Sequence, residues 1–168
     1  EEIKHYAARL NLSSNNKSGI NYLEDSGYIS VIEKDIKLIM DIGEIGPTHQ
    51  PGHAHAESLS FELSLFNQRF LVNSGISSYQ ESERRSFERS TAAHNTIEID
   101  GLNSSEVWKS FRVGRRSESK IISISDTPDL TIEAQHNGYS RSTNTIIHQR
   151  EWRLTNQILQ IKDTLNGK

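Results

Sequence analysis

The chain has 168 residues, which suits one domain and is too short for a large multidomain enzyme. Its 19 basic and 22 acidic residues give a net charge of −3, which excludes a general nucleic-acid-binding protein, so no nucleic-acid partner is expected. The absence of cysteine excludes a disulfide framework and a thiolate zinc site. No run of the sequence approaches the ~20 apolar residues of a membrane span, so we expect a soluble protein without one.

The first 27 residues are expected to be a linker or domain-entry segment. They contain one possible helical turn, at residues 5–10, and a Ser- and Asn-rich segment at residues 11–21 that is typical of a linker. The chain starts without Met and contains only Met40, so we interpret it as part of a longer protein. The domain itself is predicted over residues 28–168, and a truncation at its C-terminus is left open because the last apolar run lies close to Lys168.

From Tyr28 onward, apolar and polar residues alternate in short runs, which is the pattern of half-buried β-strands. The expected strands are residues 28–33, 37–42, 58–65, 68–72, 96–100, 120–124, 130–134, 145–154 and 157–163. The short turn Phe66-Asn67 predicts a hairpin between the third and fourth of them. Because the sequence lacks the crossover helices of a parallel sheet, it predicts an all-β fold, an antiparallel β-sandwich.

Two long loops interrupt the strands, and function is most often found in such loops. The first, residues 43–57, contains His49, His53 and His55. In an extended backbone, residues two apart project from the same side, so His53 and His55 are predicted to lie close enough for one metal ion. Glu57 continues that side, and His94, at the end of the second loop (75–95), is the best distant ligand. The alternative is that the loop is simply exposed and polar.

The cupins also carry His-x-His on a β-barrel, followed by a Glu three or four residues later. Here the next acidic residues are Glu57 and Glu62, which do not fit that spacing, so a cupin is disfavoured.

Basic residues gather around the second loop. Between Arg84 and Arg116 there are seven basic and four acidic residues, a local charge of +3 in a chain of −3. Guanidinium groups bind carboxylates and sulfates bidentately, so this region suits an acidic ligand. Arg84 and Arg89 lie in the loop itself and are the best candidates, whereas the arginines at 112, 115 and 116 are expected on solvated strand faces.

Four motifs in order carry a resemblance to a known family. They are GPTHQPGHAHAESLSFEL at 46–63, RFLVNSG at 69–75, RSTAAHNTIEIDG at 89–101 and SFRVGRR at 110–116. Together they closely resemble the heparinase II/III family, and the resemblance extends from Tyr28 to the C-terminus. It implies that this chain is the antiparallel β-sandwich that follows an N-terminal α/α toroid in a polysaccharide lyase. Such lyases cleave acidic glycans beside a uronic acid by β-elimination.

The resemblance also implies roles for individual residues. His53 corresponds to a catalytic residue, and His55, His94 and Asn73 correspond to zinc ligands. Asn73 stands where the family usually has Asp, and an amide lacks the negative charge of a carboxylate, so zinc binding is uncertain. Three arrangements are left open: weak coordination through the Asn73 carbonyl, substitution by Glu57, or a site held by hydrogen bonds alone.

Other expectations concern what lies outside the chain. The catalytic Tyr and Asn of the family lie on the toroid, so the isolated fragment is expected to be inactive. Tyr79, Arg84 and Arg89 are expected to orient an acidic polysaccharide or oligosaccharide, or to pack against the toroid. The resemblance implies a periplasmic or secreted protein, although a cytoplasmic one is not excluded. The competing hypothesis is a non-catalytic carbohydrate-binding or architectural module in surface-polysaccharide metabolism.

Overall fold

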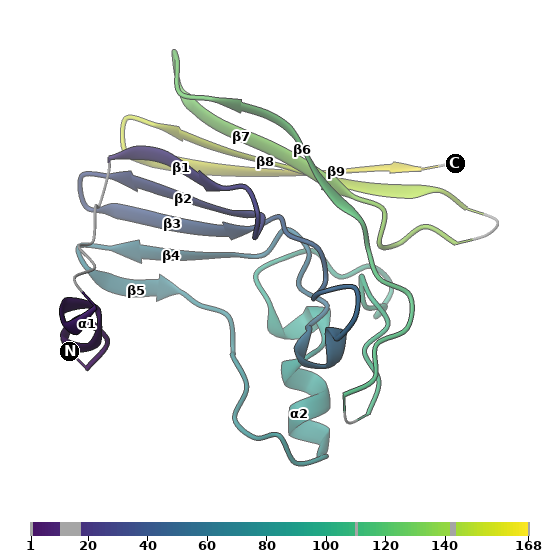
Figure 1. Ribbon diagram of the computed structural model, residues 1–168. Helices are drawn as coiled ribbons and strands as arrows, with labels where there is room; N and C mark the ends of the chain where they lie inside the picture. Colours follow the sequence, from purple (N-terminus) through teal and green to yellow (C-terminus); the bar gives the residue numbers. More distant parts are fainter. Residues whose placement is uncertain (1, 11–17, 110, 142–143, 168) are drawn as a thin grey trace.

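The computed structural model describes residues 2–10, 18–109, 111–141 and 144–167. Within them, the strands form two antiparallel sheets, one of five strands and one of four (Figure 1). The predicted all-β sandwich is therefore confirmed. Residues 11–17 of the expected linker, and Ser110 in the last motif, lie outside the described residues.

The five-stranded sheet contains β1 (Gly19–Leu23), β2 (Tyr28–Glu33), β3 (Ile36–Asp41), β4 (Phe61–Leu65) and β5 (Gln68–Leu71), paired in sequence order. Strand β1 falls inside the segment that we expected to be a linker, so the sheet begins earlier than predicted. Ile20 lies opposite Val31 of β2 and packs against the core, while the polar residues around it hide this strand in the sequence. The helix α1 (Glu2–Arg9) includes most of the expected helical turn.

The four-stranded sheet contains β6 (Ser119–Ser125), β7 (Leu130–His136), β8 (Ile146–Thr155) and β9 (Ile158–Gly167), again paired in sequence order. One face of each sheet is apolar, and the two faces share a single core. Its buried members are Ile29, Val31, Ile36, Leu38, Met40, Ile42, Leu59, Phe61, Leu63, Leu130, Ile132, Ala134, Trp152 and Leu154. The sandwich forms because burying the alternate apolar side chains of both sheets removes them from contact with water, which is favourable.

The turn between β4 and β5 occurs where it was predicted. Phe66 and Asn67 both have positive φ, at 52° and 60°, as the tight turn of a two-residue hairpin requires. The hairpin therefore has the register that places Glu62, Arg69 and Asn73 close to one another.

One predicted strand is wrong. Residues 96–100 form no ladder, and only an isolated bridge between Ile99 and Leu102 occurs there. The reason is that this segment is held by side chains: Thr96 Oγ1 donates to Ser58 O, and Tyr139 Oη donates to Ile97 O. These bonds tie the segment to the loops beside it in place of a neighbouring strand.

The second loop contains helical structure that was not predicted. Helix α2 (Glu83–Glu88) begins after Ser82, whose Oγ accepts a hydrogen bond from Arg85 N. Two 3₁₀ turns lie nearby, η1 (Pro51–His53) and η2 (Thr91–Ala93). These short elements lie beyond the ends of β3, β4 and β5, where the two long loops meet (Figure 1).

Candidate functional site

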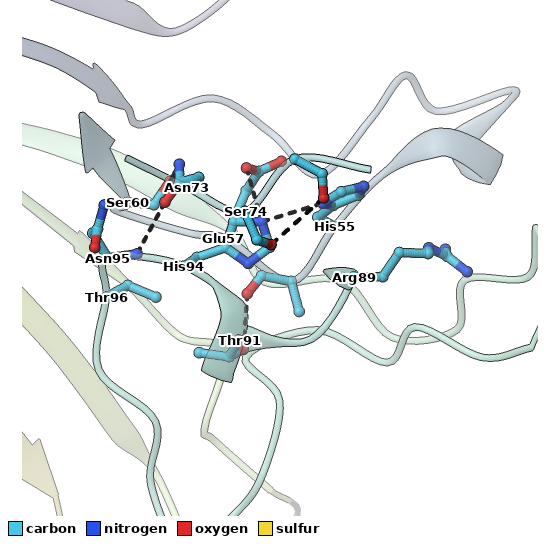
Figure 2. A network of polar contacts seen from close by, with 12 residues as sticks. His55, Glu57, Ser60, Asn73, Ser74, Arg89, Thr91, His94, Asn95 and Thr96 are labelled. Atoms are coloured by element: carbon cyan, nitrogen blue, oxygen red, sulfur yellow. Dashed lines mark hydrogen bonds and ion pairs between the residues drawn. The ribbon is translucent and has the colours of Figure 1, made fainter. Parts of the chain in front are cut away.

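Three side chains converge where the two long loops meet. His55 and Glu57 follow η1, and His94 follows η2. Nδ1 of His55 lies 3.1 Å from Nε2 of His94, which in turn lies 3.5 Å from Oε2 of Glu57 (Figure 2). One nitrogen or oxygen from each residue lies within 4.8 Å of the other two, which is close enough to hold one metal ion.

Hydrogen bonds to backbone carbonyls fix the two loops to each other. Ala56 N donates to Arg89 O at 2.9 Å, and Thr91 Oγ1 donates to Ala56 O at 2.8 Å. Both bonds are buried or partly buried, so breaking them would leave polar groups without partners. The positions of Glu57 and His94 are therefore set by contacts between segments far apart in sequence.

The hydrogen bonds of His94 define its neutral form. Its Nδ1 lies 2.7 Å from Ser90 O, and a carbonyl only accepts, so Nδ1 carries the proton. In the neutral ring, Nε2 then presents its lone pair to His55 and Glu57. A ring nitrogen held by a backbone carbonyl while the other nitrogen is free to coordinate is the usual arrangement of a metal-binding histidine.

Burial shifts the pKa values of all three groups in the direction that favours the neutral form. It lowers the pKa of His55 to about 4, with the neighbouring His94 as a second cause, and it lowers the pKa of His94. Burial, followed by the carboxylates Asp41 and Glu62, raises the pKa of Glu57 to about 7. With His94 neutral, its contact with Glu57 is not a salt bridge at neutral pH. Among the described residues, no Lys or Arg pairs with Glu57, and two neutral imidazoles beside such a carboxyl group suit a divalent metal ion.

The group opens into a cavity of about 410 Å³. Its walls include His53, His55, Glu57, Asn73 and His94. The structure thus brings every histidine that we predicted for the site to one cavity, in which they have different positions and partners.

His53 is not part of the His55–Glu57–His94 group. We predicted that His53 and His55, on an extended backbone, would both lie close enough for one metal ion. Instead, His53 belongs to the 3₁₀ turn that Pro51 begins, and it is not among the residues whose ligand atoms converge. The exposed His53 ring instead lies 5.2 Å from the Tyr79 ring and 5.3 Å from the Phe111 ring. These contacts orient an accessible imidazole at the edge of the cavity.

Asn73 is held away from the two histidines. Its Oδ1 accepts from Asn95 N at 3.0 Å, its Nδ2 donates to Ser60 Oγ at 3.3 Å, and its backbone N donates to Glu62. Figure 2 shows its side chain beside Ser60 and Asn95. Of the three arrangements left open, the geometry favours Glu57 in the place of the third ligand.

The three residues expected to contact substrate differ in exposure. Arg89 is 2% exposed, and its guanidinium donates to the carbonyls of Ala54, Trp108 and Arg112, so it holds the loops together. Arg84 is exposed and pairs with Glu88 at 2.9 Å. Tyr79 is 60% exposed and lies against His53. Arg84 and Tyr79 are therefore accessible to a ligand, and Arg89 is not.

A second polar network, which we did not predict, lies between the sheets. Asp163 of β9 accepts from Arg150 Nε at 2.6 Å and Nη2 at 2.9 Å, and it lies 2.6 Å from Nε2 of His148. His148 Nδ1 lies 2.9 Å from His136 Nε2. Gly138 N donates to His136 Nδ1, so in the neutral form His136 Nε2 carries the proton and donates to His148 Nδ1. The proton of the neutral His148 ring is then on Nε2, which donates to Asp163.

Arg150 connects this network to the site. Its Nη1 donates to Leu59 O at 2.9 Å and to Asn95 O at 2.7 Å. Leu59 lies two residues after Glu57, and Asn95 follows His94, so one buried guanidinium fixes both segments that carry the group. We call Arg150, Asp163, His148 and His136 the Arg150 network. The sequence signal for it is a polar residue at inward positions of β8, His148 and Arg150.

The fold and site together define an antiparallel β-sandwich with a candidate His-Glu-His metal-binding group at one end of the five-stranded sheet. The chain belongs to the family described as "Heparinase II/III-like, C-terminal", whose model matches residues 15–168. That match includes β1, in agreement with the earlier start of the sheet. No curated protein matches the sequence closely enough to count as a relative.

Solved structures of two lyases have the same fold. Heparan sulfate lyase HepC from Pedobacter heparinus, in a mutant form, is 18% identical with a TM-score of 0.70, and the match covers 99% of this chain and 25% of that one. Heparinase III, the BT4657 gene product, is also 18% identical with a TM-score of 0.70, with 99% and 25% covered. This chain thus spans about a quarter of the length of either lyase. Among the described residues, no helix is long and apolar enough to cross a membrane.

Proposed function

We propose that this chain is the β-sandwich part of a polysaccharide lyase that cleaves uronic-acid-containing acidic glycans by β-elimination. The observation that carries the proposal is the shared cavity, in which the accessible His53 lies at the edge of a partly buried His55–Glu57–His94 group. The family and the two solved lyases support the reaction class.

In this reaction, His53 takes the proton from the carbon next to the uronate carboxylate. Imidazole is the most frequent general base in enzymes, and His53 is positioned by Tyr79 and Phe111. The electron pair passes to the carboxylate as an enolate and then forms the new carbon–carbon double bond as the glycosidic C–O bond breaks. The leaving oxygen needs a proton from an acid, which we assign to the N-terminal toroid expected outside this chain.

The His55–Glu57–His94 group would hold zinc, with Glu57 in the role that the resemblance gave to Asn73. A zinc ion there would supply positive charge beside the substrate carboxylate. The three residues themselves keep the two loops in register, whether they are joined by hydrogen bonds or by the ion. Tyr79 and Arg84 would contact the acidic glycan, and Arg89 would act only through the loops that it holds. We further propose a periplasmic or secreted location.

The test uses the parent protein that contains this chain. His53→Ala is expected to abolish the unsaturated product, which absorbs in the near ultraviolet, while the circular dichroism spectrum stays unchanged. His49→Ala, which changes an exposed histidine of the same loop, is the matched control and is expected to retain activity. A folded His53→Ala variant that still forms product would remove His53 from the mechanism.

A non-catalytic carbohydrate-binding module is the second candidate, and Asn73 in the place of the family's Asp favours it. Under this function, the parent protein binds acidic oligosaccharides and forms no unsaturated product. Protein prepared without chelator would also contain no zinc and would not respond to added zinc. Zinc content near one equivalent, together with product formation, would contradict this candidate.

A further inference from the structure

The cavity extends from the metal-binding group onto the outer face of the five-stranded sheet. Tyr28, Ile39, Asp41, Glu62 and Arg69 line this extension. The neighbouring Ile29, Leu38 and Met40 point into the core, so alternation places Tyr28 and Ile39 on the outside, 41% and 50% exposed. We call these five lining residues the sheet platform.

Strand register assembles the sheet platform. Tyr28 lies opposite Asp41, and Ile39 lies opposite Glu62, so two cross-strand pairs lie side by side on three adjacent strands. Each pair places one exposed apolar or aromatic surface beside one carboxylate. An apolar surface next to a few fixed polar groups is typical of a small-ligand site.

The polar groups of the sheet platform are held by partners of their own. Asp41, which lies opposite Tyr28, accepts from Gly43 N at 3.0 Å. Glu62 accepts from Arg69 at 2.9 Å and from Asn73 N at 3.2 Å. These second contacts fix the carboxylates before a ligand arrives, which lowers the entropy cost of binding.

The charges of the sheet platform favour hydroxyl groups over acidic groups. Asp41 and Glu62, with Glu57 beside them, are acceptors when ionised, and the nearby cation Arg69 is already paired with Glu62. A carboxylate of the ligand would meet like charge here. Sugar hydroxyls would instead donate to these oxygens, while the apolar face of the ring covers Tyr28 and Ile39.

We propose that the sheet platform binds an uncharged sugar ring of the glycan, next to the acidic ring that reacts at His53. This inference rests on the proposed function, because it places a further unit of the same substrate. It assigns the substrate a direction across the molecule, from His53 at the loops toward β2 and β3.

The experiment is a titration of the isotopically labelled chain with a tetrasaccharide of alternating glucuronic acid and N-acetylglucosamine, followed by NMR. We expect amide shifts at Tyr28, Ile39 and Asp41, together with shifts around His53. Tyr28→Ala is expected to weaken binding by about tenfold, since exposed aromatic contacts often dominate such sites. The matched control is Tyr22→Ala, because Tyr22 has nearly the same exposure, 42%, and lines a different cavity.

Two further measurements keep the test decisive. If Tyr28→Ala does not fold, Ile39→Ala removes an exposed side chain from the same surface and is expected to weaken binding severalfold. Saturation transfer from the Tyr28 ring is expected to reach the N-acetylglucosamine protons rather than the glucuronate protons.

The outcomes separate this inference from the proposed function. Binding that shifts the loop amides but is unchanged in the folded Tyr28→Ala and Ile39→Ala variants overturns the sheet platform and leaves the lyase proposal intact. Transfer to the glucuronate ring overturns the assignment of an uncharged unit. A wild-type chain that shows no shifts with the tetrasaccharide also overturns the sheet platform, whereas the lyase proposal is decided by product formation in the parent protein.

Discussion

Two pairs of histidine rings beside a carboxylate occur in this molecule, one at the loops and one between the sheets. His55 and His94 lie 3.1 Å apart next to Glu57, and His136 and His148 lie 2.9 Å apart next to Asp163. Both pairs have nearly perpendicular rings. In composition and spacing the two clusters are almost the same.

They differ in where their lone pairs point. In the Arg150 network, Gly138 N, Arg150 and the two rings give each of the relevant nitrogen and oxygen atoms a fixed partner. At the loops, His94 Nε2 lies 3.1 Å from His55 Nδ1, but both rings and the Glu57 side chain also line a cavity. Two histidines and a carboxylate therefore form a candidate metal site only when their metal-ligand atoms border the same open cavity.

The largest effect is expected from removing the link between the two clusters. Arg150→Met leaves Asp163 and the carbonyls of Leu59 and Asn95 without their partner, which is expected to lower the free energy of unfolding by about 3–5 kcal/mol. Chemical denaturation measures this. Arg153→Met, which changes a 44% exposed side chain of the same strand, should cost less than about 1 kcal/mol. Equal losses in both variants would mean that Arg150 has no special role.

The second-largest effect is expected on zinc affinity, which should depend on the His55–Glu57–His94 group and not on the Arg150 network. Glu57→Gln removes the carboxylate of the His55–Glu57–His94 group and is expected to weaken zinc binding at least about tenfold, as measured by competition with a chromophoric chelator. Glu44→Gln, a change in an exposed carboxylate of the same loop, is the control. Zinc affinity that survives in Glu57→Gln would return the role of third ligand to another residue.

Lower pH should reduce the stability of the protein through the Arg150 network. Burial, followed by the charges of His148, Arg150 and Arg115, lowers the pKa of His136 to about 3, below its usual value of 6.5. The unfolded chain therefore binds more protons, and stability should fall as the pH drops from about 6.5 toward 3, by at most about 1.4 kcal/mol per pH unit from this residue. Denaturation curves across this range measure the slope. His136→Gln should reduce it and exposed His5→Gln should not, so an unchanged slope in His136→Gln would be evidence against this origin.

The smallest effect concerns Asn73. Asn73→Asp keeps the acceptor for Asn95 N and adds a charge outside the converging group, so zinc affinity is expected to rise less than about tenfold. The same zinc competition measures it. A larger gain, with zinc binding that no longer depends on Glu57, would show that residue 73 can rejoin the site.

The fold was largely predictable because alternation is visible wherever one face of a strand is buried. Residues 130–134 and 145–154 show it clearly, and both became strands. Residues 96–100 alternate too, yet the side chains of Thr96 and Tyr139 bind the backbone around them and no partner strand is available. Alternation of apolar and polar residues indicates that one side of a segment is buried. It does not indicate whether the backbone of that segment pairs with a strand or with side chains.

The site was predictable in part. The resemblance named His55 and His94, and the structure brings them together, but the choice between Glu57 and Asn73 depends on the hydrogen bonds that Asn73 makes across the fold. Polar residues at inward positions of β8 are a sequence signal for the Arg150 network, but their partners could not be identified from one sequence. The partners depend on the register that places Arg150 opposite Asp163 and His136 opposite His148. Sequence spacing carries no information on such pairings.

Asp163, the partner of Arg150, comes from β9, which lies C-terminal to both loops of the site. During synthesis, the ribosome delivers both loops of the site long before it delivers this aspartate. A nascent chain that ends within β8 therefore contains His55, Glu57 and His94 but lacks the counter-ion for the arginine that aligns their backbones. The alignment of the two backbone segments that carry His55, Glu57 and His94 is thus expected to follow, rather than guide, the arrival of β9.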